Sequence, residues 1–194
     1  MKLSLIVTDS GPLITLAVAG ALDTLFSPDL PVIIPDMVRH EVIRDLSKPG
    51  ASLVADWIRR NDPHRLTIGA TEVFEEFVLL QSLNPATKTK DRGEQAAAEI
   101  LSRELQGQNF GAVLVFEDSA VRKTNFLIRL PDTVVVTSTS EFLFGLQRHG
   151  LLDDAQSILE RAVDIRGNDI LVRHLAGTDS AEPLNDWPGR MGAS

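Results

Sequence analysis

Residues 3–12 read Leu3-Ser4-Leu5-Ile6-Val7-Thr8-Asp9-Ser10-Gly11-Pro12, and this stretch decides the fold class. Its first five residues lack the alternation of a strand with one wet face, which is typical of a buried parallel strand. The Gly-Pro turn then starts a helical stretch that reaches Phe26. A second strand, 31–35, has proline at both ends, so the chain begins as strand, helix and strand.

The same alternation continues along the chain. We predict further helices and strands, the helices at 36–46, 51–60, 73–83, 93–105, 118–129, 139–149 and 152–164 and the strands at 66–68, 112–116 and 134–136. Parallel strands need helical crossovers, so this order predicts an α/β fold, a three-layer α/β/α sandwich with a mainly parallel central sheet.

One domain accounts for most of the chain. We assign residues 1–165 to it, although the pattern within 62–90 is weak and resembles an insert. Residues 166–194 are rich in glycine, proline and aspartate. We therefore expect them to form a C-terminal tail that is loose or bound to a partner.

The composition of the 194 residues excludes several classes of protein. With 0 Cys and 4 scattered His, a thiolate or histidine metal site is not expected. The net charge of −8 and the aromatic content of 5% argue against nucleic-acid binding by bulk charge or by stacked rings. Asp9 and Pro12 interrupt the apolar N-terminal run, and no other stretch approaches the roughly 18 apolar residues of a membrane span. We expect a cytoplasmic protein with no membrane partner.

Two aspartates follow predicted strands. Asp9 follows the first strand, and Asp118, preceded by Glu117, follows the strand at 112–116. Ligands of an open parallel sheet bind beyond the carboxyl ends of its strands. Each aspartate also suits the N-cap of the next helix, which is the simpler interpretation of either one alone.

Two glutamates are predicted to point inward from helices. Glu41 lies within the apolar stripe of its helix, so its carboxylate needs an arginine or a metal ion as a compensating charge. Asp45 projects to much the same face one turn later, either as a helper ligand or at the wet edge of the stripe. Glu94 shares an inward stripe too, but Asp91-Arg92-Gly93-Glu94 also fits a capping box.

The predicted sheet would deliver Asp9, Glu41, Glu94 and Asp118 to one crevice. Crowded carboxylates repel one another, and their natural neutraliser is a hard, oxygen-preferring cation, so we expect one or two Mg²⁺ or Mn²⁺ ions. Such ions activate water and offset the charge that develops during phosphodiester hydrolysis. Basic residues that could bind a polyanion lie nearby in the sequence, although each also fits a solvated helix face: Arg39, Arg44, Lys88, Lys90, Arg92, Arg122 and Lys123.

Four segments together resemble the PIN-domain ribonucleases, especially the bacterial and archaeal toxins of toxin–antitoxin pairs. The segments are Val7-Thr8-Asp9-Ser10-Gly11-Pro12-Leu13-Ile14, Ile34-Pro35-Asp36-Met37-Val38-Arg39-His40-Glu41-Val42, Asp91-Arg92-Gly93-Glu94-Gln95-Ala96 and Leu114-Val115-Phe116-Glu117-Asp118-Ser119-Ala120-Val121-Arg122. The resemblance spans 3–151 and implies that Asp9, Glu41, Glu94 and Asp118 form the acidic metal-binding quartet of an endoribonuclease. It also implies a homodimer and an antitoxin partner that enters the active-site groove.

The resemblance adds residues around the quartet. It aligns Ser10 and the pair Ser138-Thr139 with small polar residues that could hold water or phosphate. Glu117 stands where many relatives have a second aspartate. Thr8, Asp45 and Asp91 complete the candidates around the site.

Two other functions compete with the ribonuclease. A PIN-like binding or regulatory module would keep the pocket and do little chemistry. An aspartyl phosphotransferase of the haloacid-dehalogenase type would use Asp9 as its nucleophile, but that chemistry needs an aspartate where this sequence has Gly11. We therefore predict a metal-dependent endoribonuclease that attacks RNA with a metal-activated water.

Overall fold

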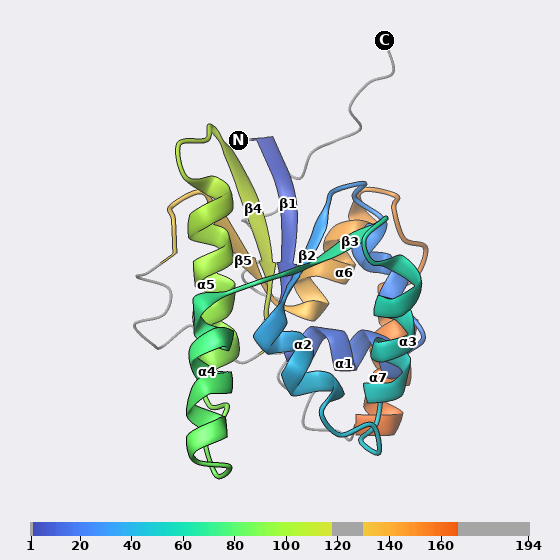
Figure 1. Ribbon diagram of the computed structural model, residues 1–194. Coiled ribbons are helices and arrows are strands. Elements are labelled where there is room, and N and C mark those ends of the chain that lie inside the picture. The colour runs from blue at the N-terminus through green and yellow to red at the C-terminus, as the bar shows by residue number, and fades with distance from the viewer. Residues whose placement is uncertain (1, 118–129, 167–194) are drawn as a thin grey trace.

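Five parallel strands form the central sheet of the computed structural model, which describes residues 2–117 and 130–166 (Figure 1). The strands lie in the order β3-β2-β1-β4-β5, and each neighbouring pair is parallel. Their bounds are β1 (Lys2–Thr8), β2 (Val32–Pro35), β3 (Leu66–Gly69), β4 (Phe110–Val115) and β5 (Val134–Thr137). The chain winds from β1 to β3 in one direction and then continues with β4 and β5 on the other side of β1. The crevice between β1 and β4 is therefore the topological switch point of the sheet, where ligands of such folds bind.

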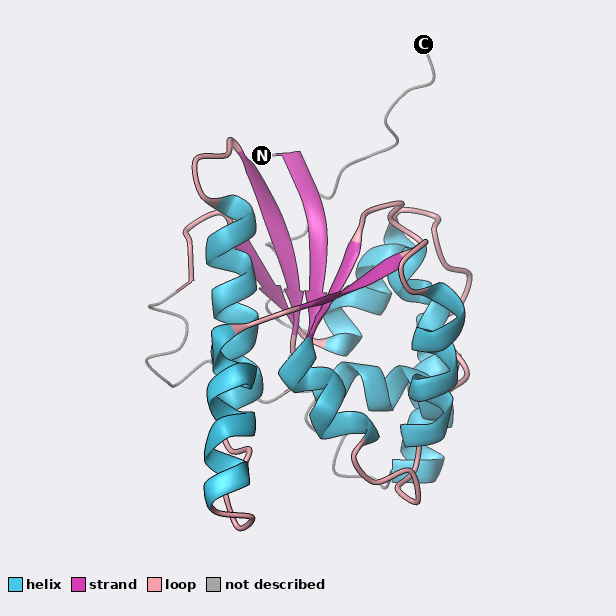
Figure 2. Ribbon diagram, in the orientation of Figure 1, coloured by secondary structure: helices cyan, strands magenta, loops and turns pink. Residues whose placement is uncertain are grey.

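Helices cover both faces of the sheet and confirm the predicted three-layer α/β/α fold. Figure 2 shows α5 on one side and α1, α6 and α7 on the other. The helices are α1 (Ser10–Val18), the 3₁₀ helix η1 (Leu22–Phe26), α2 (Asp36–Ile43), α3 (Ala51–Asn61), α4 (Glu72–Leu83), α5 (Arg92–Leu105), α6 (Thr139–Arg148) and α7 (Ala155–Arg166). No described helix has the length and apolar character needed to cross a lipid bilayer.

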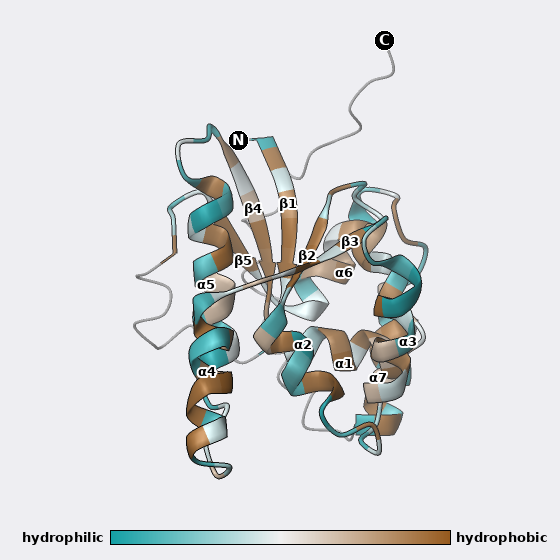
Figure 3. Cartoon of the chain, viewed as in Figure 1, coloured by the Kyte–Doolittle hydropathy of each residue, from teal (hydrophilic) through white to brown (hydrophobic). Residues whose placement is uncertain are grey.

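The two faces of β1 explain why its sequence lacks polar alternation. Leu5 and Val7 belong to the buried cluster formed with Leu101 of α5, whereas Ile6 belongs to the cluster formed with Leu13 of α1. Both faces are thus covered by apolar side chains. The hydropathy colouring of Figure 3 marks much of β1 and β4 as hydrophobic. A strand buried on both faces reads as a continuous apolar run.

Several predicted elements differ from the structure at their ends. The helix expected to reach Phe26 is interrupted at Gly20, whose φ of +66° ends α1, and the chain continues as η1. The helix expected at 36–46 ends at Ile43. The weak pattern of 62–90 does contain the predicted strand and helix, which are β3 and α4. The helix predicted at 118–129 lies outside the described residues.

The C-terminal boundary also differs. Arg166, with which the predicted tail begins, is the last residue of α7 and contacts Glu117 at the carboxyl end of β4. Residues 167–194 lie outside the described part of the chain.

The core of the α5 layer gives a test of the fold. Leu101 is completely buried, whereas Leu79 on α4 is 61% exposed. We expect Leu101→Ala to lower the free energy of unfolding by about 2–5 kcal/mol, because it leaves a cavity against the sheet. The matched variant Leu79→Ala should change it by less than about 0.5 kcal/mol. Urea unfolding measures both values, and equal effects would contradict this packing.

Candidate functional site

The switch point between β1 and β4 holds Asp9 and Glu117. Asp9 follows β1, and its backbone N–H donates to the carbonyl of Val115 at 3.1 Å, which ties the two strand ends together. Asp9 occupies the N-cap position of α1, but its side chain makes no capping hydrogen bond. The N–H groups of Ser10 and Gly11 nevertheless act on the Asp9 carboxylate and lower its pKa, so this carboxylate faces the first turn of α1 as an N-cap residue does. Its neighbour Thr8 is buried and donates its hydroxyl to the Asp9 carbonyl at 3.2 Å.

Glu41 and Asp9 converge on the bare Cα of Gly93, near the start of α5. A Cβ on Gly93 would lie 2.9 Å from Glu41 Oε2 and 3.4 Å from Asp9 Oδ1. The two carboxylates come from α2 and from the end of β1, so three separate elements meet here. A side chain at position 93 would occupy the space into which both carboxylates point.

Both carboxyls have raised pKa values. Burial is the main cause at Asp9, the N–H of Ser10 opposes it, and the charge of Glu117 adds to it, so the pKa of Asp9 rises to about 6. Burial and then the charge of Asp9 raise the pKa of Glu41 to about 7, while Arg44 lowers it and Glu94 raises it. The charges of Asp9 and Glu94 both act on Glu41, so the fold places these three carboxyl groups near one another.

Within residues 2–117 and 130–166, no ion pair compensates the charge of Asp9 or Glu41. Neither carboxylate forms an ion pair there, so the arginine partner considered for Glu41 is not found in this part of the chain. Arg44 lies close enough to lower the pKa of Glu41 but forms no ion pair with it. Among the described residues, the site therefore combines two half-buried carboxylates that repel one another with the charge of Arg44, which acts on Glu41 without an ion pair.

The donor set fits Mg²⁺ or Mn²⁺. Its ligands are carboxylate oxygens, which these ions prefer. In the described residues, no three acidic or histidine side chains form a complete cage for an ion. Mg²⁺ commonly binds through one or two carboxylates together with water and substrate phosphates, so the oxygen donors of Asp9 and Glu41 are of the kind that such an ion takes. Asp118, the fourth predicted ligand, lies outside the described residues.

The start of α5 differs from the predicted capping box. Asp91 has a φ of 61° and makes no side-chain capping hydrogen bond. A capping side chain normally needs an extended backbone, and the left-handed conformation of Asp91 does not provide it. The carboxylate of Glu94 is half-buried, and its charge acts on Glu41.

Asp45 does not join the site. Because α2 ends at Ile43, Asp45 lies in the following turn and is exposed. Its carboxylate accepts hydrogen bonds from the hydroxyl and the N–H of Ser47, at 2.6 and 3.1 Å, and these lower its pKa. Of the two interpretations of Asp45, the exposed position agrees with the wet edge and not with a helper ligand.

Three predicted polar neighbours have defined structural roles. The Ser10 hydroxyl lowers the pKa of Asp9. Ser138 is the N-cap of α6 and forms a capping box with Glu141. Thr139 is buried and donates its hydroxyl to Glu117 Oε1 at 3.0 Å. Of these three, only Ser10 lies beside the carboxylates that could hold an ion.

Glu117 is held by residues that sequence reasoning missed. Thr15 donates to Glu117 Oε1 at 2.5 Å, and Arg166 Nη1 lies 2.7 Å from Oε2. These contacts join residues 102 and 49 positions apart, so no local pattern marks them.

Most of the described basic residues that were predicted to form a rim do not act on the carboxylate cluster. Arg92 lies over the ring of Phe77 and 3.7 Å from Glu76, so it faces α4. Arg39 lines a hollow of about 520 Å³ with apolar residues of α2, α3 and β3. Lys88 and Lys90 are exposed in the loop before α5, and Arg122 and Lys123 lie outside the described residues. Among the described basic residues predicted for the rim, only Arg44 has a charge that acts on Glu41.

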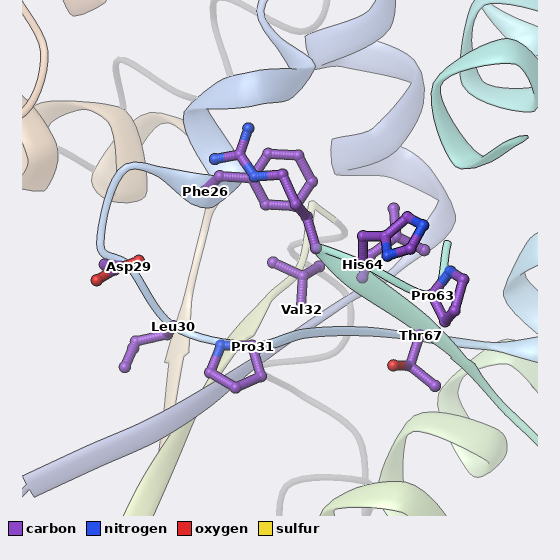
Figure 4. Close-up of a pocket in the computed structure, with 10 residues that line it drawn as sticks. Phe26, Asp29, Leu30, Pro31, Val32, Pro63, His64 and Thr67 are labelled. Carbon is purple, nitrogen blue, oxygen red and sulfur yellow. The ribbon is translucent and has the colours of Figure 1, made fainter. Parts of the chain in front are cut away.

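A second hollow lies at the opposite end of the sheet, where β2 and β3 begin (Figure 4). It has a volume of about 320 Å³ and is lined in part by Phe26, Val32 and His64. The guanidinium of Arg65 lies 4.0 Å from the centre of the Phe26 ring. This hollow shares no residue with the carboxylate cluster.

Comparison of the chain with protein-family models and with curated proteins gives no match.

The raised pKa of Asp9 predicts a pH-dependent effect of Asp9→Asn in EDTA. The pKa is about 6 in the folded protein against an ordinary value of 3.8, so the folded state binds more protons between these values. The free energy of unfolding therefore falls as pH rises through that window. Asparagine does not titrate, so its stabilising effect should grow from near zero at pH 4 to about 3 kcal/mol at pH 8.

Urea unfolding at several pH values measures this effect. Asp132→Asn is the matched control, because Asp132 is exposed and precedes β5 at the opposite edge of the sheet. The pH dependence of Asp9→Asn is compared with that of this control. A pH dependence of Asp9→Asn no larger than that of the control would contradict the crowding of carboxylates.

Proposed function

We propose that this protein is a metal-dependent endoribonuclease that hydrolyses RNA phosphodiester bonds in the cytoplasm. The observation that supports this most is the convergence of Asp9 and Glu41 on Gly93 at the switch point of the sheet. These carboxylates repel one another and have no ion-pair partner in the described residues. The resemblance of four segments to PIN-domain ribonucleases supports the same function.

The residues of the site have distinct roles under this proposal. Asp9 and Glu41 would hold the ion, and Glu94 would add negative charge beside them. Asp118 completes the set that the resemblance implies. When bound, one or two Mg²⁺ or Mn²⁺ ions would make a water acidic enough to attack phosphorus and would offset the charge on the phosphate.

Substrate binding would use the rim of the crevice. Arg44 is exposed beside Glu41 and is placed to contact a phosphate of the RNA backbone. The resemblance also supports a homodimer and an inhibitory antitoxin partner, and both stay predictions.

Cleavage of a mixed RNA pool tests the proposal. We expect the purified full chain to cut RNA with Mg²⁺ or Mn²⁺ and to stop when EDTA is added. Mutation of a residue that only supports a metal ligand commonly lowers metal affinity or activity 10–100-fold. Asp9→Asn removes a proposed ligand itself, so we expect it to lower the cleavage rate at least about 100-fold. Asp132→Asn should cut like the wild type.

Calorimetric titration with Mn²⁺ separates the alternatives if no RNA is cut. Binding by the wild type and not by Asp9→Asn would indicate an intact metal site with a narrower choice of RNA. Absence of both cleavage and Mn²⁺ binding would contradict the enzyme and favour the PIN-like binding module.

Gly93 gives a second test at the metal site. In Gly93→Ala the new methyl group would lie 2.9 Å from Glu41 Oε2, the flexible end of a side chain that can move away. Alanine also favours helix over glycine by about 1 kcal/mol, so the fold should persist. We expect Mn²⁺ affinity and RNA cleavage to fall at least about tenfold, in the range of perturbed metal sites. Wild-type affinity in this variant would show that Glu41 is not a ligand.

A further inference from the structure

Glu117 joins four elements at the carboxyl end of β4. Its Oε1 accepts hydrogen bonds from Thr15 of α1 and Thr139 of α6, at 2.5 and 3.0 Å. Its Oε2 lies 2.7 Å from Arg166 Nη1, at the end of α7. The side chains of Glu117 and Arg166 are only 12% and 23% exposed, so solvent screens this ion pair weakly.

Arg166 also contacts α1 directly. The same Nη1 donates to the Gly11 carbonyl at 3.3 Å and to the Thr15 hydroxyl. A Cβ on Gly11 would lie 2.8 Å from Glu117 Cβ and 2.9 Å from its Oε2, so the carboxylate packs against the first turn of α1. Glu117 therefore lies beside Asp9, whose pKa its charge raises, while its oxygens face α1, α6 and α7.

We propose that Arg166 is a positioning residue that holds the Glu117 carboxylate out of the metal site and so limits the negative charge available to a bound ion. This inference rests on the proposed function, because it concerns the same site. A carboxylate that accepts hydrogen bonds from two hydroxyls and a guanidinium is already satisfied. Glu117 thus differs from Asp9 and Glu41, which have no ion-pair partner in the described residues.

The two partners of this ion pair act on a bound cation in opposite directions. Without Arg166, the negative charge of Glu117 would be uncompensated and its carboxylate could turn toward the ion. Without the charge of Glu117, the guanidinium of Arg166 would repel the ion. Partners that served only to support the fold would both weaken metal binding when removed.

Mn²⁺ binding to the full chain at pH 7.5, measured by calorimetry, tests the inference without RNA. We expect Arg166→Met to bind Mn²⁺ about tenfold more tightly and Glu117→Gln about tenfold more weakly, because each changes the local charge by one unit. The double variant should return to near the wild-type affinity. Arg166→Lys keeps the charge and should also stay near it.

Arg161→Met is the matched control on the same helix. Arg161 also fastens α7 to α1, since its Nε donates to the Ala19 carbonyl at 3.0 Å, but it does not contact Glu117. We expect this variant to lose stability without a change in Mn²⁺ affinity. Circular dichroism shows that each variant is folded before its titration.

Each outcome decides between the two proposals. Unchanged or weaker Mn²⁺ binding by Arg166→Met, with binding by the wild type, would overturn the role of Arg166 and leave the metal-dependent enzyme intact. Binding by Arg166→Met alone would support the role of Arg166 and contradict a metal site in the wild type. Absence of binding in all the folded variants would overturn both.

Discussion

Repulsion between carboxylates at the edge of a parallel sheet is the constraint on which the rest of this structure depends. All five strands run in the same direction, so their carboxyl ends and the turns that follow them share one edge. Asp9, Glu41, Glu94 and Glu117 lie close to this edge, and burial makes the negative charges of Asp9 and Glu41 costly. The strands and helices that carry these side chains are anchored by the buried apolar clusters on both faces of the sheet. This packing holds the carboxylates in place despite the cost.

The protein deals with its buried carboxylates in two ways. Glu117 has an internal cation and two hydroxyl donors, so its charge is balanced by the fold itself. Asp9 and Glu41 face the bare backbone of Gly93, and neither forms an ion pair within the described residues. The same edge of the sheet thus contains one carboxylate whose charge is balanced by an arginine and two carboxylates without an ion pair in the described residues. The difference between them distinguishes a structural carboxylate from a candidate ligand.

Much of this arrangement could be predicted from local sequence, and the failures have physical reasons. The unbroken apolar run of β1 and the order of strands and helices were sufficient for the three-layer fold, because a strand covered on both faces has a distinctive composition. The apolar stripe of the helix predicted at 36–46 was sufficient to predict that Glu41 points inward. The end of α2 and the left-handed Asp91 were not predictable, since they depend on backbone geometry at helix ends. Arg166 was missed because its contact with Glu117 exists only in the folded chain.

The contact made by Arg166 has a consequence for how the site forms. The residues that meet at the edge of the sheet are supplied by β1, α2, α5, the end of β4 and, last of all, α7. Such long sequence separations mean high contact order, so these contacts form late in folding. During synthesis the network around Glu117 stays incomplete until α7 has left the ribosome. A nascent chain therefore carries the Glu117 carboxylate without its Arg166 partner until residue 166 has emerged.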